Sequence, residues 1–269
     1  MATASQKLLE RQRQTQSRLC IGLDPDEHLV PDPLRREREP WKRLLQEVVP
    51  ATAPYACAYK LNLTFYLAFG ATGWRLLEET LSLLPRDIPV ILDGKWGDVP
   101  HTATVAARIT FEQLGVDAVT VNPLLGMDSV TPFLAYSGKL IFVLARTSNV
   151  GAKDFLCRPC PTGYLLYEHI VTTALGWSGQ AEIGFVVGAT APNDFARVRQ
   201  LAPQSWLLVP GVGIQGGNAV ALVQLNGYAP LIVNVGRAIL YASNGTDFAE
   251  AAARAAASFA RIVRLEPEG

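Results

Sequence analysis

Short apolar segments recur along the chain, and stretches with a helical pattern of apolar and polar residues lie between them. Each apolar segment is continuous rather than alternating, as expected of parallel strands that are covered on both faces. We predict eight strands, at residues 19–24, 56–62, 90–95, 117–123, 139–146, 183–190, 206–212 and 231–237. Helices are predicted most clearly within residues 63–84, 99–115 and 247–263.

Eight repeats of strand and helix predict an α/β protein of the (β/α)8-barrel (TIM barrel) class. At 269 residues the chain is long for one domain, but barrels of this kind fill such a length with a single core. No internal repeat, low-complexity segment or linker divides the sequence, so we predict one barrel domain over residues 1–269. The segment 25–40, rich in Pro, Asp and Arg, predicts an irregular loop.

The composition favours a globular protein that acts on a small molecule. Hydrophobic residues make up 49% of the chain and charged residues 18%, which argues against disorder. The 24 Lys and Arg residues balance 24 Asp and Glu residues, so no basic surface for a nucleic-acid polymer is expected. No segment reaches the roughly 18 apolar residues of a membrane span, and the N-terminus lacks an apolar signal region. We therefore expect a soluble, cytoplasmic protein with no membrane partner.

The cysteines agree with a reducing compartment. Four cysteines, at positions 20, 57, 157 and 160, are too few for a disulfide framework in a chain of this length. Cys157 and Cys160 form one C-x-x-C motif without a second pair, so a zinc or redox site is not predicted there. We assign this pair to a loop.

Charged and polar residues stand where the predicted strands end. The carboxyl ends of barrel strands meet at one mouth, where barrel enzymes carry out their chemistry. Asp93 and Lys95 are two positions apart, so their side chains should point the same way from an extended strand, and Lys60 and Asn62 should share a face for the same reason. A purely structural ion-pair network is the alternative interpretation. The residues at these ends are Asp24, Lys60, Asn62, Asp93, Lys95, Arg146 to Asn149, and Arg237.

A phosphate site is predicted after the last two strands. Residues 211–216, GVGIQG, satisfy the G-x-G-x-x-G dinucleotide pattern, but they follow the seventh strand and no acidic residue lies about 20 positions later. In a barrel, the loops after strands seven and eight bind phosphate through backbone N–H groups and a helix N-terminus. We therefore expect Gly213 and Gly236 in a phosphate loop, with Arg237 holding the phosphate bidentately.

The third strand carries a motif that resembles a known family. Asp93-Gly-Lys95-Trp-Gly-Asp98-Val, followed by Thr102, resembles the D-x-K-x-x-D-(I/V)-x-x-T signature of orotidine 5'-phosphate decarboxylase. The segments GLDPD, LARTSN, FVVGATAP, VPGVGIQGG and NVGRAI also resemble that family, and together the motifs run from residue 22 to 239. Several of them resemble its longer bacterial subfamily (type 2). Trp96 departs from the pattern, which has Arg at this position.

The resemblance implies that the chain converts orotidine 5'-monophosphate (OMP) to uridine 5'-monophosphate (UMP), the last step of de novo UMP synthesis, with no metal or organic cofactor. Lys95 would be the general acid that protonates C6. Asp93 and Asp98 would keep Lys95 charged, because a lone buried lysine tends to lose its proton. Lys60 would pair with Asp93 and fix the array.

The resemblance also implies how the nucleotide is bound and how the chain assembles. Asp24 and Thr102 would hold the ribose, Ser148 the pyrimidine, and Gln215 and Arg237 the phosphate. Asn62 is expected to contact the substrate. A homodimer with shared active sites is implied, in which Asp98 and Thr102 reach into the neighbour's site.

Two other functions remain open at this point. Magnesium-dependent sugar-phosphate decarboxylases or aldolases resemble this superfamily and also use D-x-K-x-x-D, but they hold the metal partly with an acid on strand two. This chain has Lys60 there, which argues against a metal. A catalytically silent phosphate-binding barrel is the second alternative, although Asp93, Lys95, Asp98 and Lys60 are all present.

Overall fold

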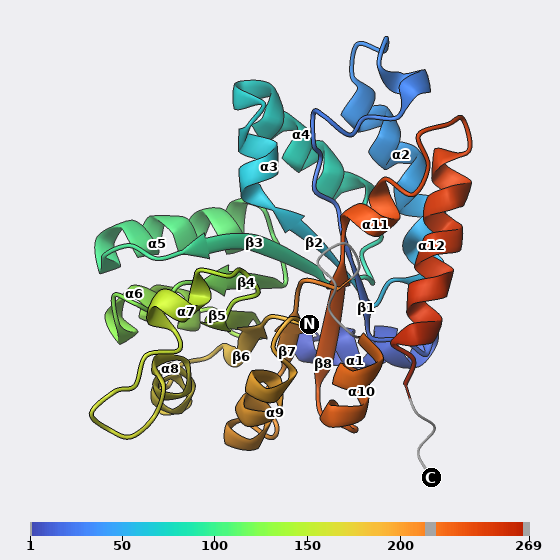
Figure 1. The fold of residues 1–269 in the computed structure, drawn as a ribbon. Coiled ribbons are helices and arrows are strands. Elements are labelled where there is room, and N and C mark those ends of the chain that lie inside the picture. The colour runs from blue at the N-terminus through green and yellow to red at the C-terminus, as the bar shows by residue number, and fades with distance from the viewer. Residues whose placement is uncertain (1, 213–218, 266–269) are drawn as a thin grey trace. The chain divides into compact units, whose positions relative to one another are not determined.

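The computed structural model describes residues 2–212 and 219–265 (Figure 1). The eight strands run in sequence order in a closed barrel, so the predicted (β/α)8 class is confirmed. Most strands are shorter than predicted, since the apolar runs continue into the loops. They are β1 (Leu19–Gly22), β2 (Ala58–Asn62), β3 (Val90–Trp96), β4 (Ala118–Val121), β5 (Leu140–Arg146), β6 (Glu182–Val187), β7 (Leu207–Val209) and β8 (Leu231–Val235).

Helices alternate with the strands, and short helical turns join them. The segment 25–40 is irregular as predicted, apart from one 3-10 turn at Asp32–Leu34. A second 3-10 turn lies at Ala53–Tyr55, and a π-helical turn at Ile109–Gln113. The α-helices are α1 (Ala4–Thr15), α2 (Pro40–Thr52), α3 (Leu63–Leu67), α4 (Gly70–Leu83), α5 (Pro100–Arg108), α6 (Met127–Leu134), α7 (Ala152–Phe155), α8 (Leu166–Ala174), α9 (Pro192–Leu201), α10 (Ala219–Asn226), α11 (Arg237–Leu240) and α12 (Phe248–Ile262).

The single helix predicted over residues 63–84 is wrong, because the structure has two helices there, α3 and α4. Gly70 has a φ of +60°, which a right-handed helix cannot continue through, so the chain changes direction at this residue. Gly73 then lies directly against the end of α3. A Cβ at position 73 would be 1.7 Å from the carbonyl oxygen of Tyr66, so only glycine fits.

The chain forms two compact units. The β1–β3 unit contains residues 7–94 and 234–269, and the β4–β7 unit contains residues 1–6 and 95–233. In the β1–β3 unit, β1 pairs with β2 and β2 with β3, all in parallel. In the β4–β7 unit, the strands β4 to β7 pair in parallel in sequence order. Strand β7 also pairs in parallel with the first residues of β8.

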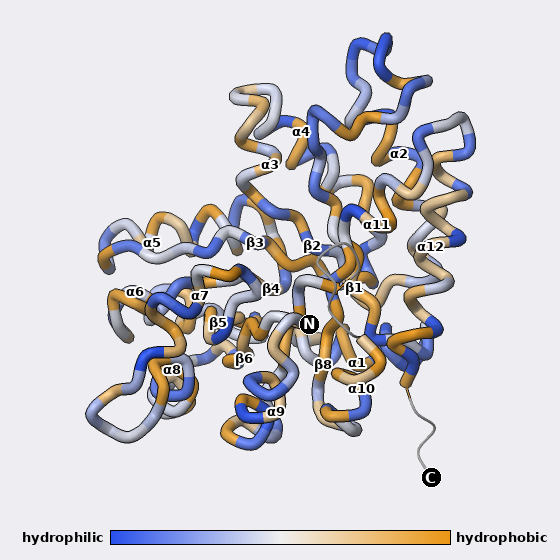
Figure 2. The backbone as a smooth tube through the Cα atoms, viewed as in Figure 1, coloured by the Kyte–Doolittle hydropathy of each residue, from blue (hydrophilic) through white to orange (hydrophobic). Residues whose placement is uncertain are grey.

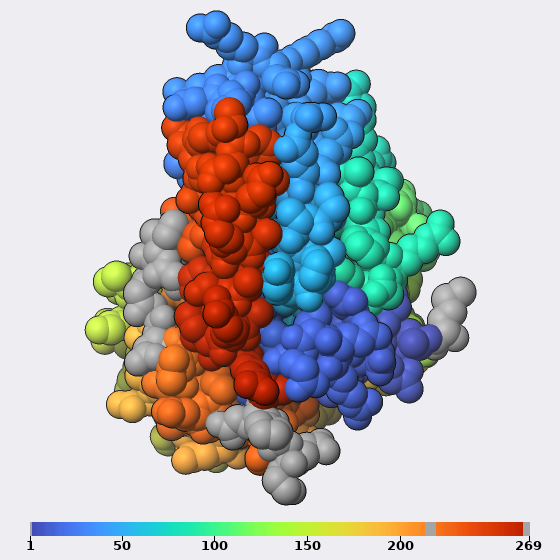
Figure 3. Space-filling view, turned by 90° about the vertical axis from the view of Figure 1, so that its right-hand side faces the viewer, coloured from blue at the N-terminus to red at the C-terminus, as the bar shows by residue number. Residues whose placement is uncertain are grey.

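The helices α12 and α2 lie side by side on one face of the β1–β3 unit (Figure 3). Helix α12 buries one stripe at helical spacing, formed by Phe248, Ala251, Ala252, Ala256 and Ala260. Figure 2 shows that α12 contains both hydrophobic and hydrophilic residues. Because most of the buried residues are alanines, the helix can approach its neighbours closely.

A buried arginine organises the loops of the β4–β7 unit. Arg199 on α9 is 8% exposed, and its guanidinium donates to the side-chain oxygen of Asn226 at 2.8 Å and to the carbonyl oxygen of Pro230 at 2.7 Å. It also donates to the carbonyl oxygens of Ala202 and Ser205. These bonds satisfy a buried charge and tie the end of α9 to the segment that enters β8.

Among the described residues, no helix is long and apolar enough to cross a membrane.

Candidate active site

Asp24 follows β1, and its carboxylate is held within the β1–β3 unit. The Oδ1 atom accepts the backbone N–H of Asn62, the last residue of β2, at 3.0 Å. The Oδ2 atom lies 3.8 Å from Nζ of Lys60. The chain must pass close to β8 to reach this position, since a Cβ on Gly22 would meet the Cα of Gly236 at 3.0 Å.

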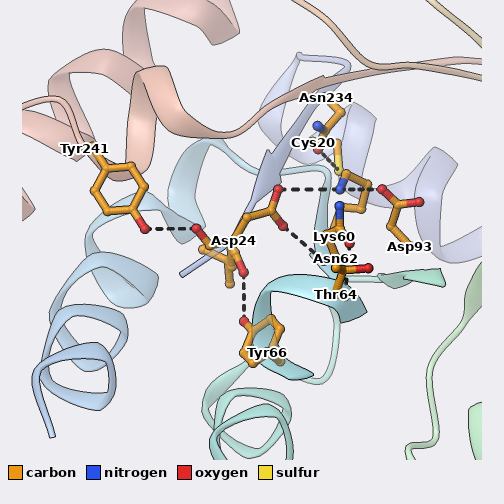
Figure 4. Close-up of polar contacts among 10 residues, drawn as sticks. Cys20, Asp24, Lys60, Asn62, Thr64, Tyr66, Asp93, Asn234 and Tyr241 are labelled. Atoms are coloured by element: carbon orange, nitrogen blue, oxygen red, sulfur yellow. Dashed lines mark hydrogen bonds and ion pairs between the residues drawn. The ribbon is translucent and has the colours of Figure 1, made fainter. Parts of the chain in front are cut away.

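Lys60 on β2 is the buried cation of this unit. Its Nζ donates to Oδ2 of Asp93 at 3.0 Å, and its side chain is 4% exposed (Figure 4). Strand register explains the pair, because Asn62 is aligned with Asp93 and Lys60 with Ile91. The predicted contact between Lys60 and Asp93 is confirmed, and Asp24 is a second partner that we did not predict.

The two carboxylates decide the charge of Lys60. Burial alone would lower the pKa of its ammonium group, but attraction by Asp24 and Asp93, together with the hydrogen bond to Asp93, outweighs burial and raises this pKa above its usual value. Lys60 therefore stays protonated, and one positive charge lies between two negative ones. The fully buried thiol of Cys20 donates weakly to Oδ1 of Asn234 at 3.5 Å. Burial raises the pKa of Cys20, so this thiol stays neutral.

Lys95 has an unusual backbone for a strand residue. Its φ is +48°, in the left-handed region, although it lies within β3. The prediction that Asp93 and Lys95 point the same way from an extended strand is therefore wrong in its premise, because the backbone is not extended at Lys95. A lysine in this conformation costs about 1–2 kcal/mol. Strain of this kind gathers at functional sites. The backbone N–H of Lys95 donates to Oγ1 of Thr120 at 3.0 Å, which helps to hold the turn.

Lys95 is exposed in this chain, whereas Lys60 is buried. Lys60 is therefore the buried lysine that flanking acids keep charged, and the prediction that Lys95 is buried is wrong. The sequence did not show which of the two lysines is buried, because both lie at the polar carboxyl end of a predicted strand. Their environments therefore differ: Lys60 lies between two carboxylates, whereas Lys95 is open to solvent.

Asp98 and Thr102 lie at the start of α5 in the β4–β7 unit, and both are exposed. Oδ1 of Asp98 accepts the backbone N–H of Val99 at 2.7 Å. Gly97 lets the chain between β3 and α5 pass close to Asn122, since a Cβ at position 97 would lie 2.8 Å from the Cβ of Asn122. Trp96, the departure from the family motif, is half-buried, and its Nε1 has no hydrogen-bond partner in the described part of the chain.

Ser148 follows β5 and is half-buried. Gly188 packs against it so closely that a Cβ at position 188 would lie 2.6 Å from the Ser148 Cα. Oγ1 of Thr190 donates to the Ser148 carbonyl oxygen at 3.1 Å. The neighbouring Arg146 pairs with Asp194 at 2.7 Å and is buried, so it holds the loop rather than facing a ligand.

Arg237 is the first residue of α11 and is exposed, directly after Gly236 at the end of β8. The predicted Gly213 and Gln215 lie outside the described residues. Cys157 and Cys160 lie on a short hairpin, in which the N–H of Cys160 donates to the carbonyl oxygen of Tyr164 at 2.7 Å. No group of three metal-binding side chains occurs within residues 2–212 and 219–265.

Three residues of the β1–β3 unit were missed by sequence reasoning. Tyr66, Tyr241 and Asn234 contact Leu23, Asp24 and Cys20 through side-chain hydrogen bonds (Figure 4). No local pattern marks them, because each partner is distant in the sequence. The one available signal was Asn234 within the otherwise apolar β8, since a buried amide needs a partner.

The fold and the charged strand ends define the class of protein, an enzyme of the (β/α)8-barrel class. Residues 17–253 match the model of the orotidine 5'-phosphate decarboxylase / HUMPS family. The match covers most of the chain, which therefore belongs to that family. The resemblance inferred from the D-x-K-x-x-D signature is confirmed.

Proteins of similar sequence are named orotidine 5'-phosphate decarboxylase, which is the first of the two names in the family description. The chain is 45% identical over 262 residues to the orotidine 5'-phosphate decarboxylase of Thermomicrobium roseum, with 95% of this chain and 93% of that protein covered. It is 41% identical over 256 residues to the protein of the same name from Phocaeicola vulgatus, covering 93% and 94%.

Solved structures agree with these relatives. The structure of Leishmania donovani OMP decarboxylase is similar with a TM-score of 0.82 and 34% identity, over 97% of this chain and 98% of that chain. Leishmania donovani UMP synthase is similar with a TM-score of 0.85 and 36% identity, but this chain spans only 57% of its length.

Proposed function

We propose that this protein decarboxylates OMP to UMP, without a metal or organic cofactor. The observation that carries the proposal is the ammonium group of Lys60 at 3.0 Å from Asp93 and 3.8 Å from Asp24. A metal-dependent sugar-phosphate enzyme would need an acid on β2, and here a buried cation neutralises the carboxylates instead. The relatives named orotidine 5'-phosphate decarboxylase support the same choice.

The chemical difficulty is the carbanion at C6 of the pyrimidine. When the bond from C6 to the carboxylate breaks, its electron pair stays on C6 and carbon dioxide leaves. An ammonium group directed at C6 stabilises the developing charge and then transfers its proton to that carbon. Lys95 takes this role, since it is exposed at the end of β3 and follows Asp93 by two positions. It is left as a neutral amine and regains a proton from solvent.

Asp93 accepts the hydrogen bond of the Lys60 ammonium group at 3.0 Å. A carboxylate at this position disfavours the negative carboxylate of the bound substrate and favours its loss as neutral carbon dioxide. The positive backbone φ of Lys95 turns the chain sharply after Asp93. Asp93 is thus held by Lys60, whereas Lys95, two positions later in the same strand, extends toward the substrate.

Substrate-binding roles follow the family pattern. Asp24 and Thr102 hold the ribose, Ser148 the pyrimidine, and Gln215 with Arg237 the phosphate, while Asn62 faces the nucleotide. Gly213 and Gly236 belong to the phosphate loop. Support comes from the structure at Asp24, whose carboxylate is fixed by Asn62, and at Arg237, which is exposed at the start of α11.

We also propose a homodimer with shared active sites. In the β4–β7 unit, Asp98 and Thr102 are exposed at the start of α5, and α5 packs against α6. Exposed apolar residues occur on α5, on α6 and in the loop that leads into α6, and a second copy would cover this set. It consists of Val99, Val105, Leu124, Leu125 and Met127, which are 55%, 38%, 60%, 54% and 41% exposed.

A cytoplasmic location is part of the proposal. All four cysteines are free thiols, and Cys20 and Cys57 are buried in the β1–β3 unit. Free thiols persist in a reducing compartment, where pyrimidine nucleotides are made.

The proposal is tested by following the absorbance of OMP on addition of purified protein in excess EDTA. We expect turnover that chelation does not reduce. Activity toward OMP that vanishes in EDTA and returns with magnesium would contradict cofactor independence, and turnover of a sugar phosphate in its place would favour the other branch of the family. Binding of UMP without turnover of OMP would indicate the silent barrel.

A further inference from the structure

Two tyrosine hydroxyls hold the backbone around Asp24. Tyr66 Oη donates to the carbonyl oxygen of Leu23 at 2.8 Å, and Tyr241 Oη donates to the carbonyl oxygen of Asp24 at 2.9 Å. The Tyr241 oxygen also accepts the backbone N–H of Asp26 at 2.7 Å. In Figure 4 the two rings approach the Asp24 backbone, while the carboxylate of Asp24 is directed to Lys60 and Asn62.

The sequence explains why this segment needs outside support. Asp24 is followed by Pro25, which has no N–H and restricts the preceding residue to extended conformations. The chain therefore leaves β1 without a helical or hairpin turn to satisfy its polar backbone groups. The Tyr241 hydroxyl donates to the carbonyl oxygen of Asp24, before Pro25, and accepts from the N–H of Asp26, after it. A phenylalanine would leave both without this partner.

Tyr241 also connects Asp24 to the helix that begins with Arg237. It directly follows α11, and its N–H donates to the carbonyl oxygen of Arg237 at 3.1 Å. Burial, followed by the carboxylates of Asp26 and Asp24, raises the pKa of Tyr241 above its usual value despite the hydrogen bond from Asp26. The hydroxyl therefore keeps the proton that it donates to Asp24.

We propose that Tyr241 is a positioning residue for the reaction and acts through Asp24, with Tyr66 as the second support of the same segment. This inference rests on the proposed function. The Asp24 carboxylate reaches both the N–H of Asn62 and the ammonium of Lys60 only if the Asp24 backbone stays in place. Removing the Tyr241 hydroxyl frees that backbone without touching the carboxylate itself.

Tyr59 supplies a matched control. It is a fully buried tyrosine of β2 in the same unit, and its hydroxyl donates to the carbonyl oxygen of Val49 at 2.9 Å, within α2. Tyr59→Phe thus removes a buried hydroxyl and a bond to a backbone carbonyl, as Tyr241→Phe does, but at a helix that carries no substrate residue. Both variants should lower the urea midpoint of unfolding.

The experiment is a double-mutant cycle on kcat/KM for OMP, with Tyr241→Phe and Tyr59→Phe each made in the wild type and in Asp24→Asn. We expect Tyr241→Phe to lower kcat/KM on the order of tenfold in the wild type. In Asp24→Asn the same change should lower it less than about twofold, because the residue through which it acts has already lost its charge. Tyr59→Phe should change it less than about twofold in both backgrounds.

Equal losses from Tyr241→Phe in the two backgrounds, or no loss in the wild type, would overturn the inference while leaving decarboxylation intact. A tenfold loss from Tyr59→Phe would also overturn it, since any buried hydroxyl would then have the same effect. If the wild type does not consume OMP, the proposed function fails first and this inference with it. Should Tyr241→Phe not fold, Tyr66→Phe decides by the same criterion.

Discussion

Lys60 and Lys95 show how local environment separates two residues of the same type. Lys60 is buried between two carboxylates, and their attraction raises its pKa above the usual value. A group of this kind contributes stability below its ordinary pKa of about 10.4, and the contribution is lost only as the pH rises through the higher folded value. Lys60 is therefore charged throughout the physiological range. Lys95 is exposed and has a backbone φ of +48°, and the proposed function gives this residue the contact with the substrate.

Arg237 provides a residue-scale prediction. If its guanidinium binds the phosphate dianion, Arg237→Ala should cost about 2–5 kcal/mol of transition-state stabilisation, because a charge-assisted bidentate contact is lost. The measurement is kcat/KM for OMP and for orotidine, which lacks the phosphate. The loss should largely disappear with orotidine, and Arg254→Ala on α12 serves as a control for a removed surface charge. An equal loss with both substrates would show that Arg237 has another task.

At the scale of elements, the start of α8 is held by one carboxylate. Glu168 accepts the backbone N–H of Leu165 at 2.7 Å and pairs with Arg197 of α9 at 2.5 Å. Burial would raise the pKa of Glu168, but the hydrogen bonds from Arg197 and Leu165 outweigh it and lower this pKa below its usual value. Helix α8 and helix α9 are thus joined by a charge that must stay ionised.

This carboxylate predicts a pH dependence. Because its folded pKa is lowered, Glu168 contributes stability that is present above its unfolded pKa of about 4.3 and is lost as the pH falls through the lower folded value. Glu168→Gln should lower the urea midpoint of unfolding at pH 7, and the difference from the wild type should shrink below about pH 4. Glu250→Gln on α12 is the control. A difference that stays constant from pH 7 to pH 3 would contradict the role given to the charge.

The elements also show what the sequence could and could not reveal. Continuous apolar runs located all eight strands, because parallel strands are buried on both faces. The break between α3 and α4 was not predicted, since a glycine within a helical pattern does not by itself indicate a positive φ. The positive φ of Lys95 was not predicted either, because its sequence pattern is that of an extended strand. The contact of Tyr241 with Asp24 joins residues 217 positions apart, and no local pattern reports such a pair.

At the scale of the whole molecule, the exposed positions of Asp98 and Thr102 are the basis of the proposed homodimer. Suppose that Lys95→Ala and Asp98→Ala are each purified, found inactive, mixed in equal amounts and allowed to exchange subunits. If Asp98 serves the neighbour's site, a mixed dimer has one site that lacks both residues and one that is intact. About half of the dimers are mixed, so roughly a quarter of the wild-type activity should return.

The same mixture contradicts sharing if nothing returns. When Asp98 acts within its own chain, every site in the mixture lacks one residue, and no activity is expected. Subunit exchange is verified by mass spectrometry of tagged chains, so that a failure to exchange is not taken for a negative result. Loss of sharing would leave the decarboxylase assignment unaffected.

The central claim is that Lys95 donates the proton to C6 of OMP. The most direct measurement is the single-turnover rate of OMP decarboxylation by Lys95→Ala, with Lys42→Ala on α2 as a matched lysine variant. We predict that Lys95→Ala slows the step by at least about 10²–10⁴-fold while the fold is retained, because a general acid contributes on that order. Lys42→Ala should react like the wild type. A folded Lys95→Ala protein that decarboxylates OMP within about tenfold of the wild-type rate would contradict the claim.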